Sequence, residues 1–188
     1  MTQMSQEDGQ DGRREALDFG PARRREIEWY DPAVFARAIR QGRFATGREM
    51  LQAIIDGELP PPPIAATLGY GPSEFGDGLA VFTLVPSETH YSPLGMVHGG
   101  VFATLLDTSM ACAIHTRLPI NVPYTTVELK INYVRPMKVE TGEVRCIGKV
   151  VHLGRSTAIS EGRIEDAKGR LIAHATTTCL ILDPIELG

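Results

Sequence analysis

Apolar residues change their spacing twice along the first third of the chain. Residues 1–28 are rich in Gln, Glu, Asp, Gly and Arg and show almost no apolar periodicity, so they bury too little surface to offset the entropy of ordering them. Between residues 29 and 55, apolar side chains recur at spacings of one, three and four, which is typical of two short helices. Prolines at residues 60–63 then favour an extended link, because proline interrupts a helix. These patterns predict a disordered tail at 1–28 and accessory helices with a proline linker at 29–63.

The remaining residues, 64–188, contain one helical pattern among several strand patterns. Two β-favouring runs, IAATLGYG and GLAVFTLVP, are separated by turn residues and predict a pair of strands. Apolar residues between Val97 and His115 then follow helical spacing over about four turns. Turn signals separate four later runs, each of which predicts a strand: YTTVELKINYVRP, GEVRCIGKVVH, RSTAISEGRIEDA and RLIAHATTTCLIL.

The later runs alternate between apolar and polar side chains. In the first of them the odd-numbered residues from Val127 to Tyr133 are apolar, and the even-numbered residues between them are polar. Such a strand has one buried face and one wet face, as in an antiparallel sheet. A single long helix among these strands has only the sheet against which to bury its apolar stripe. We therefore predict an α+β fold for residues 64–188, in which a curved antiparallel sheet wraps around one long central helix.

The composition excludes several classes of protein. With 188 residues, of which 43% are hydrophobic, the chain is long enough to bury a core. Its three cysteines, at positions 112, 146 and 179, lack the spacing of a disulfide framework or metal site, which predicts a reduced, cytoplasmic setting. The formal net charge of −4 argues against a nucleic-acid-binding protein. Because no apolar run approaches the roughly 20 residues that span a bilayer, and no secretory signal pattern occurs, we expect no membrane segment.

Candidate chemistry begins at the start of the predicted long helix. His98, Gly99 and Gly100 lead directly into this helix. Unpaired backbone N–H groups and the positive end of the helix dipole gather at such a position, and glycine lets a ligand atom approach the backbone closely. This arrangement suits the polarisation of a carbonyl or the binding of a developing oxyanion. The alternative for His98 is a helix-entry residue that only hydrogen-bonds to nearby backbone.

Asp107 lies two helical turns further along, between Leu106 and Thr108. Its side chain either points to solvent or forms a carboxylate in an apolar cleft that activates water or attacks an acyl carbon. The histidines of the chain form no HxH or HExxH pattern, so we predict no metal site. Ser92 and Ser156 lack the GxSxG pattern of an α/β-hydrolase nucleophile.

Three segments in order, HGGVFATLLDTSMACA, TTVELKINYVRP and VVHLGRSTAISEGRI, resemble the hotdog-fold thioesterases of the phenylacetic-acid-degradation (PaaI-like) type. The resemblance covers residues 64–182 and combines HGG, an acid nine residues after its His, a Y-V-R-P strand end and a G-R-S turn. It implies hydrolysis of an acyl-CoA thioester with no metal and no cofactor, since coenzyme A is part of the substrate. It also implies a homo-oligomer built from hotdog dimers, either a dimer or a tetramer, with active sites shared between subunits.

The resemblance implies roles for individual residues. Gly99 would donate its N–H to the thioester carbonyl, His98 would order the neighbouring loop, and Asp107 would act as general base or nucleophile. Thr126, contributed by the partner subunit, would help to hold the attacking water against that carboxylate; the alternative is an ordinary strand residue. The family often has Asn six residues before the motif His, where this chain has Ser92. Serine has a shorter reach and one donor, so we expect weaker carbonyl binding, or binding through a water or from a slightly different backbone position.

A second group of residues is implied in binding coenzyme A. The turn at residues 154–156 resembles the family's loop that meets the phosphate-bearing part of the nucleotide, and arginine with backbone amides suits that task. Arg155 has the alternative of being a solvated turn residue. The full set predicted to bind substrate or coenzyme A is Gly100, Tyr133, Arg135, Gly154, Arg155 and Ser156.

Two other functions remain open from the sequence. A hydratase or dehydratase acting on acyl thioesters uses the same fold, although the HGG motif with its nine-residue offset fits that chemistry less well. The other is a non-catalytic module that binds or senses acyl-CoA, in which Ser92 has blunted catalysis and the accessory helices contact a partner.

Overall fold

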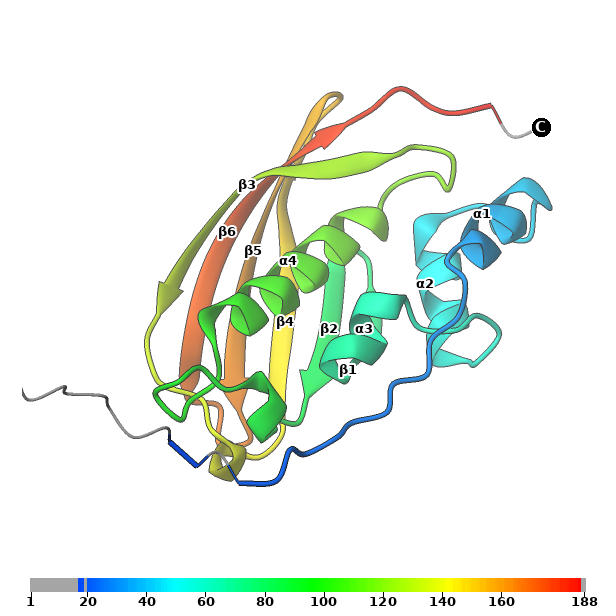
Figure 1. Ribbon diagram of the computed structural model, residues 1–188. Helices are drawn as coiled ribbons and strands as arrows, with labels where there is room; N and C mark the ends of the chain where they lie inside the picture. The colour runs from blue at the N-terminus through cyan, green and yellow to red at the C-terminus, as the bar shows by residue number, and fades with distance from the viewer. Residues whose placement is uncertain (1–16, 19, 187–188) are drawn as a thin grey trace, which may run out of the picture.

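A six-stranded antiparallel sheet curves around one long helix in the computed structural model, which describes residues 17, 18 and 20–186 (Figure 1). The helix is α4 (Gly99–His115), and the strand order across the sheet is β1-β2-β4-β5-β6-β3. Strands β1 and β3 therefore form the two edges. The strands are β1 (Tyr70–Gly76), β2 (Leu79–Leu84), β3 (Tyr124–Tyr133), β4 (Val144–Leu153), β5 (Thr157–Asp166) and β6 (Leu171–Ile181). This architecture is the predicted α+β arrangement, and the helix and strand patterns from residue 97 onward are confirmed.

The apolar stripe of α4 packs into the concave face of the sheet. Leu105, Leu106 and Met110 are almost completely buried there. Two glycines of the sheet allow this close approach: a Cβ atom at Gly148 would lie 2.3 Å from the carbonyl oxygen of Ser109, and one at Gly162 would lie 2.8 Å from Cγ of Met110. These two glycines therefore allow α4 to pack closely against β4 and β5.

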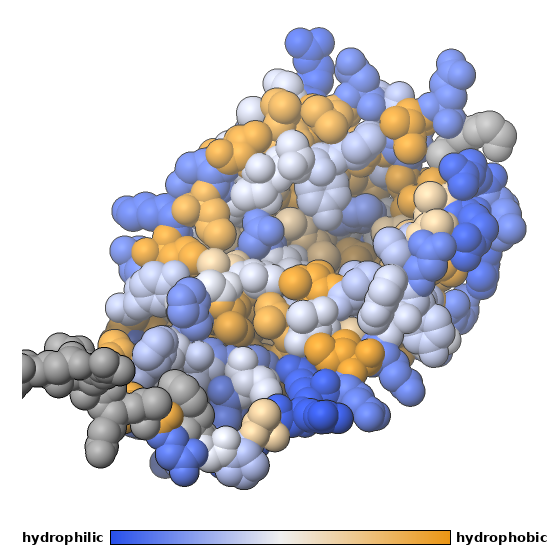
Figure 2. Space-filling view, viewed as in Figure 1, coloured by the Kyte–Doolittle hydropathy of each residue, from blue (hydrophilic) through white to orange (hydrophobic). Residues whose placement is uncertain are grey.

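The opposite face of α4 is only half-buried. In Figure 2, which views this side of the molecule, apolar and weakly polar side chains occupy much of the middle of the face, and charged side chains gather along its rim. Asp107 lies in the middle of this stripe, so its carboxylate is not sealed inside the core. The half-buried residues recur at helical spacing: Ala103, Thr104, Asp107, Thr108, Ala111, Cys112 and His115.

The strand predicted for IAATLGYG is wrong in its first part. Residues Pro63–Leu68 form helix α3, and β1 begins only at Tyr70. Proline fits the first turn of a helix, and the alanines that follow favour it. Gly69, with φ of 70°, ends the helix in the left-handed conformation that glycine adopts without strain.

The alternation predicted for residues 127–133 is broken by a β-bulge. The pairing of β3 with β6 shifts between Thr126 and Glu128, so Val127 is 59% exposed rather than buried. Leu129 still faces the core, but Tyr133, at the strand end, is 56% exposed. The extra residue explains why Thr126 points to the concave side next to α4.

The accessory part contains two short helices, α1 (Ala33–Arg40) and α2 (Gly47–Ile55). They bury a small apolar cluster of their own, which includes Phe44, Leu59 and Ile120. Residues 20–30 run extended below the sheet in Figure 1, where Arg23 forms an ion pair with Glu88. Residues 1–16 and 19 of the predicted tail lie outside the described residues, so its disorder and the domain division at 28 and 63 stay predictions.

Neither a membrane-spanning helix nor a cluster of metal ligands occurs among the described residues. Within them, no helix combines the length and the apolar character needed to cross a membrane. Across the same residues, no group of three or more His, Cys, Asp or Glu side chains is placed to hold a metal ion.

Candidate active site

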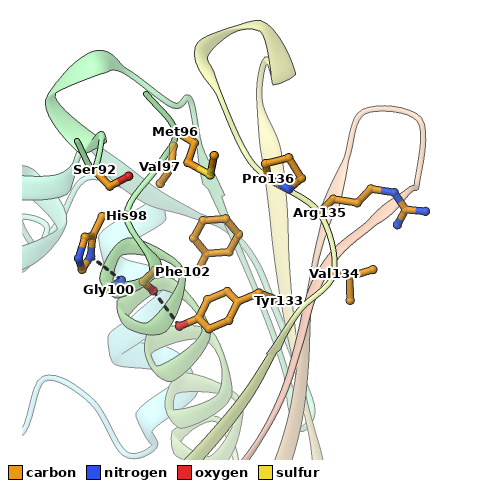
Figure 3. A pocket seen from close by; sticks show the side chains of 11 residues that line it. Ser92, Met96, Val97, His98, Gly100, Phe102, Tyr133, Val134, Arg135 and Pro136 are labelled. Atoms are coloured by element: carbon orange, nitrogen blue, oxygen red, sulfur yellow. Dashed lines mark hydrogen bonds between the residues drawn. The ribbon is translucent and has the colours of Figure 1, made fainter. Parts of the chain in front are cut away.

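A cleft of about 710 Å³ opens where α4 begins and β3 ends (Figure 3). One wall is the loop that leads into α4, and the other is the end of β3 with the residues that follow it. Most of the lining is apolar, and its polar side chains come from both walls. The lining residues are Ser92, Met96, Val97, His98, Gly99, Gly100, Phe102, Tyr133, Val134, Arg135 and Pro136.

His98 is the N-cap of α4. Its Nδ1 atom accepts a 2.9 Å hydrogen bond from the N–H of Gly100, and its own N–H donates to the carbonyl of His90 at 2.8 Å. The N–H of Gly99, one residue earlier, has no acceptor among the described residues. The first N–H groups of a helix have no intrahelical acceptor, and Gly99 is one of the residues that line the cleft. The structure therefore places His98, Gly99 and Gly100 at one cleft, and the backbone N–H of Gly99 stays the predicted donor to a ligand.

Tyr133 closes the cleft from the side of β3. Its hydroxyl donates to the carbonyl of Gly99 at 3.2 Å, and its ring packs edge-on against Phe102 with centroids 5.5 Å apart. A Cβ atom at Gly99 would lie only 3.1 Å from the Tyr133 hydroxyl oxygen. Position 99 thus has little room for a side chain. Packing therefore favours glycine there, in addition to the close approach of a ligand atom that glycine allows.

Ser92 and Arg135 lie at the rim of the cleft. The Ser92 hydroxyl oxygen accepts a long 3.4 Å hydrogen bond from the N–H of Leu94, within a turn closed by the N–H of Ser92 and the carbonyl of Met96 at 2.8 Å. The guanidinium of Arg135 donates to the carbonyl of Leu171 and points away from Ser92 and His98 (Figure 3). Arg135 is therefore placed next to the cleft but is turned outward in this structure.

Asp107 and Thr126 form a pair outside this cleft. The Thr126 hydroxyl donates a 2.8 Å hydrogen bond to Oδ1 of Asp107. The resemblance implied a Thr126 contributed by the partner subunit; in this structure the Thr126 that contacts Asp107 belongs to the same chain, and the β3 bulge turns its side chain toward α4. Asp107 follows Gly99 by eight residues, which is about 12 Å along a helix axis. One chain thus carries the two halves of the predicted site at separate places.

Several hydroxyl and thiol groups surround the Asp107 carboxylate. Burial, with a smaller contribution from the charge of Asp107, raises the pKa of Cys112 to about 12. Burial is also the main cause that raises the pKa values of Tyr124 and Cys179, and the charge of Asp107 adds a smaller contribution to each. These groups stay protonated and neutral, so the thiols are not nucleophiles near neutral pH.

The hydroxyl of Tyr70 pairs with that of Thr108 at 3.1 Å, next to Asp107. Sequence reasoning missed this neighbourhood. The sequence could have indicated Thr108 and Cys112, because helical spacing places them on the same face of the helix as Asp107. Tyr70 and Tyr124 come from strands at opposite edges of the sheet, and only the fold brings both of them near Asp107.

The turn at residues 154–156 lies at the other end of the sheet from the cleft. Thr157 pairs with Leu180, which pairs with Thr125 near the start of β3. Tyr133 is eight residues further along that strand, roughly 26 Å away at the rise of a β-strand. The structure therefore does not bring the turn that contains Arg155 together with Tyr133 and Arg135 in one chain.

Comparison with known proteins places the chain in a family. Residues 94–173 match the sequence model of the thioesterase superfamily. Over 117 residues the chain is 31% identical to the proofreading thioesterase EntH of Cronobacter sakazakii, and this alignment covers 61% of the chain and 82% of that protein. The chain belongs to the thioesterase superfamily. Its predicted resemblance to PaaI-like hotdog proteins is confirmed.

Other members of the thioesterase superfamily give the same picture. The 1,4-dihydroxy-2-naphthoyl-CoA hydrolase of Listeria monocytogenes is 28% identical over 104 residues, which cover 55% of the chain and 83% of that protein. The structure of the phenylacetic acid degradation protein PaaI from Thermus thermophilus superposes with a TM-score of 0.58 and 28% identity, covering 64% of the chain and 99% of that structure. The match to an esterase-named protein of Halobacterium salinarum spans less than half of that protein, 44%.

Proposed function

We propose that the protein hydrolyses acyl-CoA thioesters to a free acid and coenzyme A. The observation that carries this proposal is the Asp107 carboxylate, held by the Thr126 hydroxyl on the open face of α4 in a member of the thioesterase superfamily. Two relatives support the substrate class, since one is named a thioesterase and another a CoA hydrolase. We propose that no metal or cofactor takes part.

The proposed chemistry uses the helix start and the carboxylate together. The thioester oxygen accepts the N–H of Gly99, where the helix dipole favours the negative charge that develops as the carbonyl is attacked. In the general-base route, Asp107 takes a proton from water and the resulting hydroxide oxygen bonds to the acyl carbon. The C–S bond then breaks, and the leaving thiolate of coenzyme A takes that proton from Asp107. In the nucleophilic route, an Asp107 oxygen bonds to the acyl carbon and the C–S bond breaks, which releases the thiolate of coenzyme A. Water then hydrolyses the mixed anhydride to the free acid and supplies the proton that the thiolate takes up, which restores the Asp107 carboxylate.

A second copy of the chain completes the proposed site. Within one chain the N–H of Gly99 and the carboxylate of Asp107 are about 12 Å apart along α4, too far to act on one thioester carbon. Strand β3 is an edge strand, and Val127 and Tyr133 on it are more than half exposed. Two copies joined along this edge bring the Asp107 of one to the Gly99 of the other, so the functional unit is a dimer or a tetramer of such dimers. Such a dimer also offers the turn at 154–156 of one copy to the cleft of the other.

The proposal is tested by the release of free coenzyme A from a panel of aromatic, short, medium and long acyl-CoAs, with a chelator present. Wild type is compared with Asp107→Asn, which keeps the shape of the side chain and can still accept from Thr126. We expect wild type to turn over at least one acyl-CoA and Asp107→Asn to lose at least about 1,000-fold in kcat, the usual scale for a lost general base. If both proteins bind acyl-CoA and neither releases coenzyme A, catalysis is refuted and a binding module takes its place.

A further inference from the structure

The accessory helices are joined to the connection that leads from α4 into β3. Residues 45–47, here called the clamp segment, lie at the start of α2 and run antiparallel to residues 118–120 of that connection. Two backbone hydrogen bonds and one bridge join them: Gly47 N–H to the Leu118 carbonyl at 3.0 Å, Ile120 N–H to the Ala45 carbonyl at 3.2 Å, and the pair Thr46 with Pro119. The contact is thus a short piece of sheet outside the main sheet.

The clamp segment is itself fixed by the capping of α2. The Thr46 hydroxyl accepts the N–H of Glu49 at 3.2 Å, and the Glu49 carboxylate accepts the N–H of Ala45 at 2.7 Å. This reciprocal arrangement satisfies two backbone donors at the helix start. The side chain of Ile120 adds an apolar anchor, because it is buried in the cluster that α1 and α2 form. The connection before β3 is therefore held by the accessory helices from both backbone and side chain.

Gly47 also packs directly against His115, the last residue of α4. A Cβ atom at this position would lie 1.5 Å from Cδ2 of His115 and 2.3 Å from the His115 carbonyl oxygen. The His115 ring in turn packs edge-on against Tyr124, with centroids 5.2 Å apart. Tyr124 is the first residue of β3 and stands two residues before Thr126. A continuous row of contacts leads from the clamp segment to the hydroxyl that binds Asp107.

We propose that the accessory helices position the catalytic carboxylate: the clamp segment fixes the start of β3 and so holds the Thr126 hydroxyl on Asp107. The inference rests on the proposed function, in which Asp107 acts on the thioester. Gly47 and Ile120 are positioning residues in this account, since neither reaches Asp107. The accessory part then belongs to the catalytic apparatus and is more than a surface addition to the hotdog domain.

Two variants loosen the clamp in different ways, and one serves as a control. Gly47→Ala introduces the clash with His115, and Ile120→Ala removes the apolar anchor without any clash. Gly71→Ala in β1 is the matched control, because a Cβ atom there meets nothing within 4 Å and the backbone of Gly71 is not in the left-handed region. All three are made in the full chain, alone and combined with Thr126→Val.

Two measurements test the proposal independently. Hydrogen exchange of the amides in residues 117–127, measured without substrate, should speed up in Gly47→Ala and Ile120→Ala but not in Gly71→Ala. In coenzyme A release, kcat should fall about tenfold, the scale of one lost hydrogen bond to a charged group, while KM changes less than about twofold. Adding Thr126→Val should then cause little further loss, because both changes remove the same interaction.

Unchanged exchange in both clamp variants would overturn the inference, and so would losses in kcat that multiply with that of Thr126→Val. The exchange measurement needs no turnover, so it decides the clamp even if wild type releases no coenzyme A. A wild type that releases no coenzyme A would refute the proposed function, but it would leave the role of the clamp segment in holding Thr126 to the exchange measurement. If Gly47→Ala does not fold, Ile120→Ala carries both measurements.

Discussion

The hydroxyl of Thr126 donates a 2.8 Å hydrogen bond to Oδ1 of Asp107, although the two residues lie on different elements and 19 positions apart. The bulge in β3 directs this hydroxyl to α4, and the same bulge exposes Val127 on the other face. A hydroxyl that donates to one carboxylate oxygen leaves the second oxygen able to accept a proton from water. The hydrogen bond therefore holds the Asp107 carboxylate in one orientation.

Replacing the Thr126 hydroxyl should lower the rate without removing the site. Thr126→Val keeps the shape and β-branching of the side chain but loses the donor, so we expect kcat to fall about tenfold, the scale of a lost hydrogen bond to a charged group. Thr126→Ser keeps the hydroxyl and should stay within about threefold of wild type. Steady-state release of coenzyme A measures both. Equal rates for wild type and Thr126→Val would show that the hydroxyl does not assist Asp107.

Restoring the amide that the family often has should raise the rate. Ser92→Asn gives a longer side chain with an N–H donor at the rim of the cleft, and asparagine can keep the turn by accepting the N–H of Leu94. Because one oxyanion donor is worth on the order of 100-fold in kcat, we expect a clear gain on the best acyl-CoA. Ser92→Gln, which overshoots this position, is the control. A rate unchanged or lowered in Ser92→Asn would mean that the carbonyl is bound elsewhere.

The sequence predicted the elements that bury long periodic stripes and failed where one residue changed the local geometry. Helix α4 and strands β3 to β6 were readable because each repeats its pattern over ten or more residues. The sequence of α3 predicts a strand wrongly, because six residues hold too few periods to separate a helical pattern from a strand pattern. The inversion at Val127 was not readable, since a bulge inserts one residue without any change in composition.

For the candidate site, the sequence predicted the grouping of contiguous residues but not that of residues on separate elements. His98, Gly99 and Gly100 are contiguous, so their meeting at the cleft followed from the helix start alone. The contact of Asp107 with Thr126, and the distance between Arg155 and Tyr133, depend on the strand order β4-β5-β6-β3. No spacing along the chain encodes that order, because it is decided by which strands pair.

The three cysteines should resist thiol reagents in the folded protein. Burial raises the pKa of Cys112 and of Cys146 to about 12, and it also raises that of Cys179. At pH 8, a thiol with that pKa is ionised in only about one molecule in 10,000, and the thiolate is the reactive form. A disulfide dye should therefore label the native protein very slowly and the urea-unfolded protein at all three positions. Rapid labelling of the native protein at pH 8 would contradict this.

Acid should destabilise the fold through His115. Burial lowers the pKa of His115 to about 4, and its Nε2 atom has no hydrogen-bond partner among the described residues. The unfolded chain binds a proton at this side chain below about pH 6.5 and the folded chain only below about pH 4. The stability that the neutral ring supplies is therefore complete above pH 6.5 and is lost as the pH falls toward 4, up to about 3 kcal/mol in the free energy of unfolding. His115→Asn cannot titrate, so its urea-unfolding free energy should fall less than that of wild type between pH 7 and pH 4.5, whatever its value at pH 7. Parallel losses in the two proteins would show that the ring is already protonated, or open to solvent, in the folded state.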